Sequence, residues 1–432
     1  MKKNKSPLLA RDSLQTILAS LICVLGGLIA GYLVLLLIEP KGAAEAITAV
    51  LKSFLRYPAG PLRMKYLGQT LVRTVPLLMC ALSVLFAYKV GMFNIGAAGQ
   101  YVAGACVCLY AALAWNLPWY LCLVLAMLGG ALLGGIAGVL KTKCNVNVVI
   151  SGIMLNWITL YLTNTILSSD AVKSPASPYT KNLRGSNPDA LIPDIGLRQI
   201  FGNEKSVTLA IPLAIIIAII IWAVLNKTKF GYELKATGNN YNAAKYAGMK
   251  QNRNIILTMM ISGALAGLGA GLLYLTGIEE WETTISSVPD MGFNGIAVAF
   301  LGGLSPIGSM LSAFFIQHIT FGGSFVNLKV YPSQISSLIS SLIIYLCAFV
   351  AFFKFFMQTR LRKAEEKKLA AAKAAVETVA ETVVEADDEA SVEAAEEAAV
   401  IAAVVVAEEA IGEDAGEDAG EDAGAEEGGE EQ

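Results

Sequence analysis

Long apolar stretches decide what this chain can fold into. Several runs of about 20 residues, such as 207–225, contain almost no charged side chain, and 55% of all residues are hydrophobic. A helix of that length crosses the hydrocarbon layer of a membrane and satisfies its own backbone hydrogen bonds there. The sequence therefore predicts an all-α, polytopic transmembrane helix bundle.

We expect about ten spans, with both termini on the cytoplasmic side, because Lys and Arg gather in the loops this topology places inside. The expected spans are residues 14–38, 68–88, 97–115, 118–140, 148–167, 207–225, 254–278, 292–303, 304–325 and 335–357. Residues 41–66 alternate apolar and basic side chains, which is typical of a helix lying in the outer interface. Residues 168–206 contain four prolines and form an expected external cap.

Charge divides the chain into a membrane domain and a tail. Residues 1–357 carry 26 basic and 12 acidic side chains, a net charge of +14, whereas residues 358–432 carry 6 and 23, a net charge of -17. We expect a cytoplasmic N-terminus at 1–13, a transmembrane domain at 14–357 and a cytoplasmic acidic tail at 358–432. The repeated Glu-Asp-Ala-Gly of the tail predicts disorder in part of it.

The polar segment 226–253 lies between two apolar runs. It holds six Lys or Arg residues and a single acid, Glu233, which places it in the cytoplasm. Residues 240–248 are rich in helix formers and end at Gly248, as a short helix does. Such a helix can receive a push from a soluble partner. The alternative is a basic loop that only orients the protein.

Two glycine-rich segments, 91–100 and 292–303, interrupt hydrophobic regions and predict two discontinuous helices. Backbone that leaves helical geometry at membrane depth lies inside protein or beside a watery cavity, so both segments are candidate linings of a solute path. A tight turn is the alternative for 91–100. The candidate path residues are Asn94, Gln100, Asn156 and Asn294. These amides could equally serve only to satisfy the interrupted backbone.

Several chemistries find no support in the residues. The seven cysteines form no CxxC pair, so we expect them to be packing residues. The single histidine, His318, has no partner at metal-ligand spacing, so we expect it to be a packed or pore-lining residue. No phosphate-binding GxxxxGK[ST] motif is present. Arg73 is the one obvious charge within a span. Either the chain is a passive channel, or the energy for transport comes from another subunit.

Five segments resemble the permease subunits of bacterial ABC importers of the sugar and branched-chain amino acid type, most of all their nucleoside branch. They are Leu71-Val-Arg-Thr-Val-Pro76-Leu, Gly91-Met-Phe-Asn-Ile-Gly, Asn147-Val-Val-Ile-Ser-Gly-Ile-Met-Leu-Asn156, Gly238-Asn-Asn-Tyr-Asn-Ala-Ala-Lys-Tyr-Ala-Gly248 and Gly292-Phe-Asn-Gly-Ile-Ala-Val-Ala-Phe-Leu-Gly. The resemblance covers residues 10–357 in the same order. Residues 242–248 resemble the Glu-Ala-Ala-x-x-x-Gly coupling element of these importers, with Asn242 in place of the acid. We therefore call residues 226–253 the coupling loop.

The resemblance implies a permease of the bacterial cytoplasmic membrane that works by alternating access, without a cofactor or enzymatic activity of its own. Its implied partners are a second related permease, a cytoplasmic ABC ATPase, an extracytoplasmic solute-binding lipoprotein and membrane lipid, and no nucleic acid. The implied ATPase contacts are Asn239, Asn242, Ala243, Ala244 and Gly248. The implied solute is a nucleoside, with a simple sugar such as ribose or galactose as the alternative.

Overall fold

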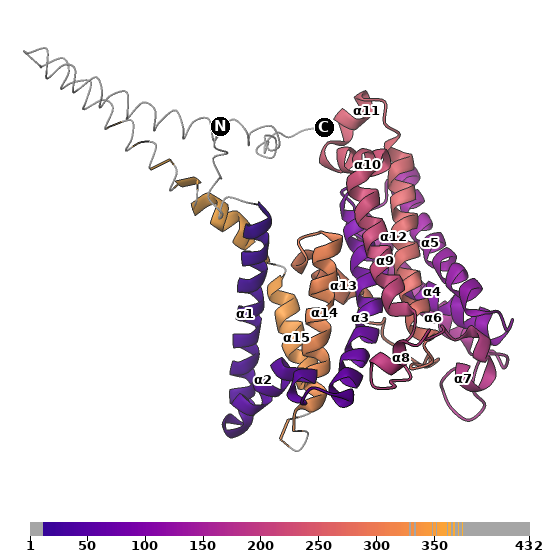
Figure 1. Ribbon diagram of the computed structural model, residues 1–432. Helices are drawn as coiled ribbons and strands as arrows, with labels where there is room; N and C mark the ends of the chain where they lie inside the picture. Colours follow the sequence, from indigo (N-terminus) through magenta and orange to yellow (C-terminus); the bar gives the residue numbers. More distant parts are fainter. Residues whose placement is uncertain are drawn as a thin grey trace, which may run out of the picture. The chain divides into compact units, whose positions relative to one another are not determined.

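The computed structural model describes residues 12–327, 330–331, 334–347, 349–350 and 352–360, with a few more positions as far as 374. The chain forms two units, one of residues 20–350 and one that joins residues 1–19 to 351–432. The larger unit is helical, and its described residues contain only isolated β-bridges in place of a sheet (Figure 1). The all-α prediction is confirmed.

Six helices are long and apolar enough to cross a membrane in the described part of the chain. They are α1 (Asp12–Ile38), α3 (Pro61–Tyr88), α5 (Trp119–Cys144), α6 (Val148–Leu167), α9 (Ala210–Lys227) and α12 (Gln251–Tyr274). The shorter helices in the other expected spans are α4 (Ala97–Leu113), α13 (Met291–Leu301), α14 (Pro306–Gly322) and α15 (Ile335–Cys347). That the chain crosses the membrane ten times, with both termini on the cytoplasmic side, remains a prediction.

The helix α3 begins earlier than the sequence predicted. Its first residue is Pro61, directly after Gly60. Proline suits the first helical position because its ring fixes φ at a helical value. The expected interfacial helix over 41–66 is therefore shorter. It consists of α2 (Ala43–Lys52) and a single 3₁₀ turn, η3 (Ser53–Arg56).

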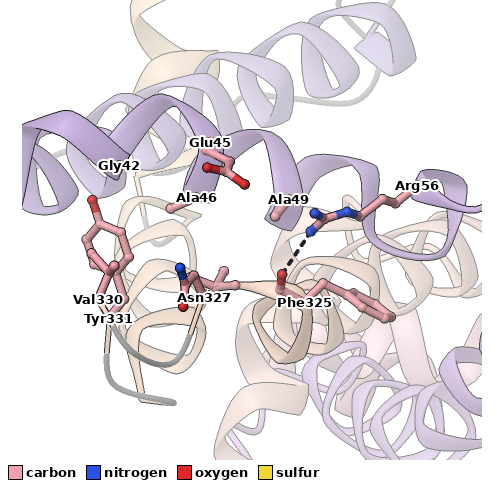
Figure 2. A pocket seen from close by; sticks show the side chains of 10 residues that line it. Gly42, Glu45, Ala46, Ala49, Arg56, Phe325, Asn327, Val330 and Tyr331 are labelled. Carbon is pink, nitrogen blue, oxygen red and sulfur yellow. Dashed lines mark hydrogen bonds between the residues drawn. The ribbon is translucent and has the colours of Figure 1, made fainter.

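The segment α2–η3 packs against the end of α14 and the residues that follow it. Arg56 Nη1 donates a hydrogen bond of 3.0 Å to the carbonyl of Phe325 (Figure 2). His318 of α14 shares a 2.8 Å hydrogen bond with the carbonyl of Leu51 and packs edge-on against the Phe54 ring. The lone histidine is thus a packing residue.

Two rows of glycine join α5 to α12. Gly130 and Gly134 of α5 lie against the backbone around Gly263 of α12, and a Cβ atom on any of these three would strike a backbone carbonyl of the other helix. Gly104 of α4 meets α12 in the same way at Gly267. The sequence spaces Gly130, Gly134 and Gly138 four residues apart in α5, and Gly263, Gly267 and Gly271 four residues apart in α12. These two rows are the two faces of one backbone contact.

The helix α13 has 11 residues, about half of the roughly 20 that a full span needs, and it lies in the second of the two segments predicted to form discontinuous helices. It contacts α3 at Gly295, which packs on Cys80, and α4 at Gly292, which packs on Ala98. A turn with φ of +63° at Gly303 then leads into α14. Gly302 and Gly308 lie in contact across this turn, which leaves no room for a side chain at either position.

The segment 168–206 is an ordered cap over helix ends, and it includes α7 (Leu183–Ser186) and α8 (Leu197–Ile200). Asn187 Nδ2 donates to the carbonyl of Ala112 at 2.8 Å, and the Ile192 amide donates to the carbonyl of Leu275 at 3.0 Å. Figure 1 shows α7 and α8 at the end of the larger unit opposite α10 and α11. We call these the α7–α8 end and the α10–α11 end.

Candidate functional site

The coupling loop folds into two helices, α10 (Lys229–Asn239) and α11 (Tyr241–Tyr246), each started by a capping side chain. Thr228 Oγ1 accepts from the Gly231 amide at 3.1 Å, and Asn240 Oδ1 accepts from the Ala243 amide at 2.9 Å. These bonds satisfy amides that the first turn of a helix leaves without partners. Gly248 follows α11 with φ of +78°. The expected short helix is confirmed.

Most of the predicted coupling residues lie on the surface. Asn239, Asn242, Ala243 and Gly248 are exposed, whereas Ala244 is buried and fixes α11 to the protein. A cavity of about 560 Å³ lies between α10, residues 247–250 that follow α11, and the start of α12. Its lining residues include Tyr232, Glu233, Gly248, Lys250, Arg253 and Leu257. The α10–α11 end thus offers a convex helix next to a concave surface.

Side-chain hydrogen bonds fasten α10 and α11 to the first turn of α12. Gln251 Nε2 donates to the carbonyl of Tyr241 at 3.1 Å, and the Tyr241 hydroxyl donates to Asn252 Oδ1 at 3.2 Å. Asn254 Nδ2 donates to Thr237 Oγ1 at 3.2 Å in a buried contact. A displacement of α11 would therefore reach α12 directly.

The end of α10 touches residues 89–96, which we call the broken segment because they separate α3 from α4. Gly238 lies so close that a Cβ atom there would be 3.0 Å from the Gly91 nitrogen. Burial lowers the pKa of Lys89 at this contact, and the nearby positive charge of Lys235 lowers it further. The coupling loop and the broken segment are thus in backbone contact.

Asn94 and Gln100 meet in a buried network that holds the broken segment. Asn94 Nδ2 donates to Gln100 Oε1 at 2.8 Å and to Ser262 Oγ of α12 at 2.7 Å. The Ser262 hydroxyl in turn donates to the Ser83 carbonyl of α3 at 2.8 Å. Both amide side chains are 1% exposed. The network therefore ties three helices to the broken segment.

Asn156 of α6 binds the backbone on both sides of the point where α4 begins. Its Oδ1 accepts from the Gly99 amide at 2.7 Å, and its Nδ2 donates to the Ile95 carbonyl at 3.2 Å. Gly99 lies in the first turn of α4, where amides have no partner within the helix. In this conformation the Asn156 side chain provides hydrogen-bond partners for backbone groups where the helix is interrupted. This is one of the two roles considered for these amides, the other being contact with a solute.

Asn294 stands apart from the other three candidate residues. It lies half-buried in the first turn of α13, and its backbone amide donates to the Asp290 carbonyl at 2.8 Å. No side-chain hydrogen bond joins it to Asn94, Gln100 or Asn156 in the part of the chain that the structure describes. Contact of the four amides with a solute stays a prediction.

Comparison with known proteins decides the family. Residues 66–349 match the model of the family described as "Branched-chain amino acid transport system / permease component". The chain belongs to this permease family. It is 34% identical over 313 residues to the guanosine ABC transporter permease protein NupP of Bacillus subtilis, which covers 72% of this chain and 86% of that protein.

The names of two further relatives give a nucleoside and glucose as their solutes. The nucleoside ABC transporter permease protein NupB of Lactococcus lactis is 33% identical over 282 residues, covering 62% of this chain and 75% of that protein. The glucose ABC transporter permease protein TsgB13 of Haloferax volcanii is 30% identical over 271 residues, covering 61% and 70%. No solved structure matches the permease.

The sequence prediction missed part of the surface at the α10–α11 end. Tyr246 is 93% exposed, and Tyr232 of the unexpected helix α10 is 66% exposed. Large exposed aromatic side chains are frequent anchors of protein interfaces. Thr228 as a cap, followed by buried Gly231, Leu234 and Thr237 at three-residue spacing, is the signal that could have revealed α10.

Proposed function

We propose that this permease is the membrane subunit of an ABC importer that carries nucleosides into a bacterial cell, driven by ATP that a separate subunit hydrolyses. The observation that carries the proposal is the 34% identity to a guanosine permease across 72% of the chain. The proposed partners are a second related permease, a cytoplasmic ATPase and an extracytoplasmic solute-binding lipoprotein. The transmembrane helices meet membrane lipid.

The contacts at the α10–α11 end support a mechanism of alternating access. The ATPase binds α11 through Asn242, Ala243 and the neighbouring exposed residues, and Tyr246 enters the same interface. ATP binding moves α11 and α10 together, because hydrogen bonds fasten both to α12. The motion reaches the broken segment through Gly238.

The broken segment is where this motion changes the membrane domain. Asn94 connects it to Ser262 of α12, and Asn156 connects it to α6. Shifting the segment exchanges these hydrogen bonds for others or for water, which reorients the helices around the solute path. The half-length helix α13 contacts α3 and α4 next to this segment, at Gly295 and Gly292. It forms the other side of the proposed path.

Uptake measurements test the proposal. Labelled guanosine is given to a strain that lacks this permease and to the same strain complemented with the permease gene. We expect uptake only in the complemented strain. Labelled ribose, galactose and glucose are given in parallel, because a glucose permease is among the relatives. Uptake of a sugar without uptake of guanosine would show that the solute is that sugar and not a nucleoside. Guanosine uptake that persists after inactivation of the partner ATPase would indicate a passive channel instead.

A further inference from the structure

The position of Trp157, in the middle of α6, is unusual for a tryptophan of a membrane protein. Tryptophan side chains gather at the two membrane surfaces, where the ring meets lipid and its N–H meets water. Four of the five tryptophans of this chain lie in loops or within the first or last two turns of a helix, and they are Trp115, Trp119, Trp222 and Trp281. Trp157 is the exception.

The contacts at the two ends of α6 give the depth of Trp157. At one end Asn147 caps the helix, and at the other Asn164 Nδ2 donates to the Ile285 carbonyl of the loop before α13 at 2.8 Å. The 20 residues of α6 have the length that one crossing needs. Trp157 is about 14 Å from either end at 1.5 Å per residue. It therefore lies near the centre of the hydrocarbon layer.

Trp157 belongs to a stripe of exposed side chains along one side of α6, which we call the α6 face. Its members recur at three- and four-residue spacing, and they are Ile150, Met154, Trp157, Ile158, Tyr161 and Leu162. The opposite side of α6 packs on the start of α4, where Gly152 meets the backbone of Gly96. The α6 face is thus uncovered in the part of the chain that the structure describes.

Two members of the α6 face carry polar groups. The rings of Trp157 and Tyr161 stack with their centres 6.2 Å apart and are 42% and 56% exposed. Among the described residues, neither the Trp157 Nε1–H nor the Tyr161 hydroxyl has a hydrogen-bond partner. Lipid tails offer no acceptor, and a donor left unpaired among them is costly. A protein surface with acceptor atoms would remove this cost.

The comparison with α9 shows what a lipid-facing helix looks like in this chain. The strongly exposed residues in the middle of α9 are all isoleucine, and they are Ile215, Ile216, Ile219 and Ile220. The helix α6 is the least apolar of the six long helices, yet most of its surface is open. Trp, Tyr and Met are enriched where proteins meet. The α6 face therefore has the composition of a protein interface.

The depth of the α6 face identifies its partner. An ATPase or a lipoprotein outside the membrane cannot reach side chains about 14 Å from either end of the helix. The importer described under the proposed function, on which this inference rests, has one further transmembrane protein, the second related permease. We propose that this permease packs on the α6 face within the membrane and accepts hydrogen bonds from Trp157 Nε1 and the Tyr161 hydroxyl.

Photochemical crosslinking in the complete importer tests the contact. The importer is assembled in lipid nanodiscs from two differently tagged permeases, and a benzophenone amino acid is placed at position 157. Position 219 of α9 is the lipid-facing control. Position 345 of α15 is the competing surface, because Tyr345 is 65% exposed. Illumination should join the two permeases from position 157, and this adduct should be absent from the other two preparations.

Removal of a single hydroxyl gives a second readout. Tyr161→Phe should speed the exchange of the tagged second permease about threefold, the factor that an average hydrogen bond between membrane helices corresponds to. Tyr345→Phe is the matched control and should leave the exchange rate unchanged. If the α6 face met lipid, Tyr161→Phe would only remove an unpaired hydroxyl from hydrocarbon, and it would not speed the exchange.

Three results in an importer that takes up guanosine would overturn this interface and leave the proposed function intact. The first is an adduct between the permeases from position 219 or 345 and none from position 157. The second is an adduct at position 157 that joins two copies of this chain. The third is rapid reaction of a single cysteine at position 157 with a water-soluble thiol reagent, which would show that the face is wet.

The opposite combination would separate the two proposals in the other direction. An adduct between the two permeases from position 157, in an importer that does not take up guanosine, would support the interface and reject the nucleoside assignment.

Discussion

Gly248 shows how much a single backbone angle can matter to coupling. Its φ of +78° is a conformation that residues with side chains rarely adopt, yet no atom lies within 4 Å of the place where its Cβ atom would be. A substitution there is therefore opposed by backbone strain and not by a clash. For a β-branched residue the strain is about 1–2 kcal/mol.

We predict that Gly248→Val leaves the permease in the membrane but abolishes or strongly reduces uptake, because it displaces the end of α11. Asn tolerates this conformation, so Gly248→Asn is the control and should retain most of the uptake. Uptake and ATP hydrolysis are measured together at matched expression. Normal uptake by the Val variant would contradict the docking role of α11.

The candidate path residues differ in accessibility, which makes them separable by labelling. Single cysteines at positions 94 and 294, in a background without natural cysteines, should both react with a water-soluble thiol reagent in the working importer, and solute should slow the reaction. We predict that position 94 reacts at least tenfold more slowly, because Asn94 is 1% exposed here and an opening that costs about 1.4 kcal/mol already gives that factor. If both positions stay inert, the path lies elsewhere.

At the scale of elements, local sequence signals predicted where the helices lie better than they predicted which helices contact each other. The apolar run 148–167 was predicted as a span and is the helix α6 to the residue, and the structure shows that Asn147 caps it. The start of α3 was not predicted correctly, because the basic residues Arg63 and Lys65 in its first turns suggested a helix lying in the membrane interface. The spacing of each glycine row was visible in the sequence, but its partner was not. The network of Ser83, Asn94 and Ser262 joins residues up to 179 positions apart, and no local pattern encodes such a meeting.

The contact between α5 and α12 yields a matched pair of substitutions. A Cβ atom at Gly130 would strike the backbone carbonyl of Gly263, whereas one at Gly135 would meet only the flexible side chain of Met260 at 3.1 Å. We predict that Gly130→Ala destabilises the permease by about 1–3 kcal/mol and that Gly135→Ala changes its stability by less than about 0.5 kcal/mol. Thermal unfolding in detergent measures both. Equal effects would show that the backbone contact does not govern stability.

At the scale of the whole molecule, the acidic tail is the part that the resemblance does not explain. Residues 375–432 lie outside the described residues, so the expected disorder there stays a prediction. The final 20 residues contain nothing larger than Glu or Gln and cannot bury enough apolar surface to offset the entropy of ordering.

We predict that deletion of residues 412–432 leaves assembly and uptake within about twofold of the full chain, because exposed charge pairs contribute little and are screened by salt. Uptake is compared at low and physiological ionic strength. A large change that depends on salt would show that the tail regulates the basic coupling loop.

The glycine contact between α5 and α12 also restricts how the permease can change shape. Sliding one helix along the other by one turn would move Met259 from Gly134 toward Gly130, where the close backbone contact leaves room only for hydrogen. We therefore expect the two helices to move as one rigid body during transport, with the relative motion occurring between this pair and the helices on either side of it. A covalent crosslink between α5 and α12 should leave uptake unimpaired, whereas a crosslink between α3 and α13 should stop it.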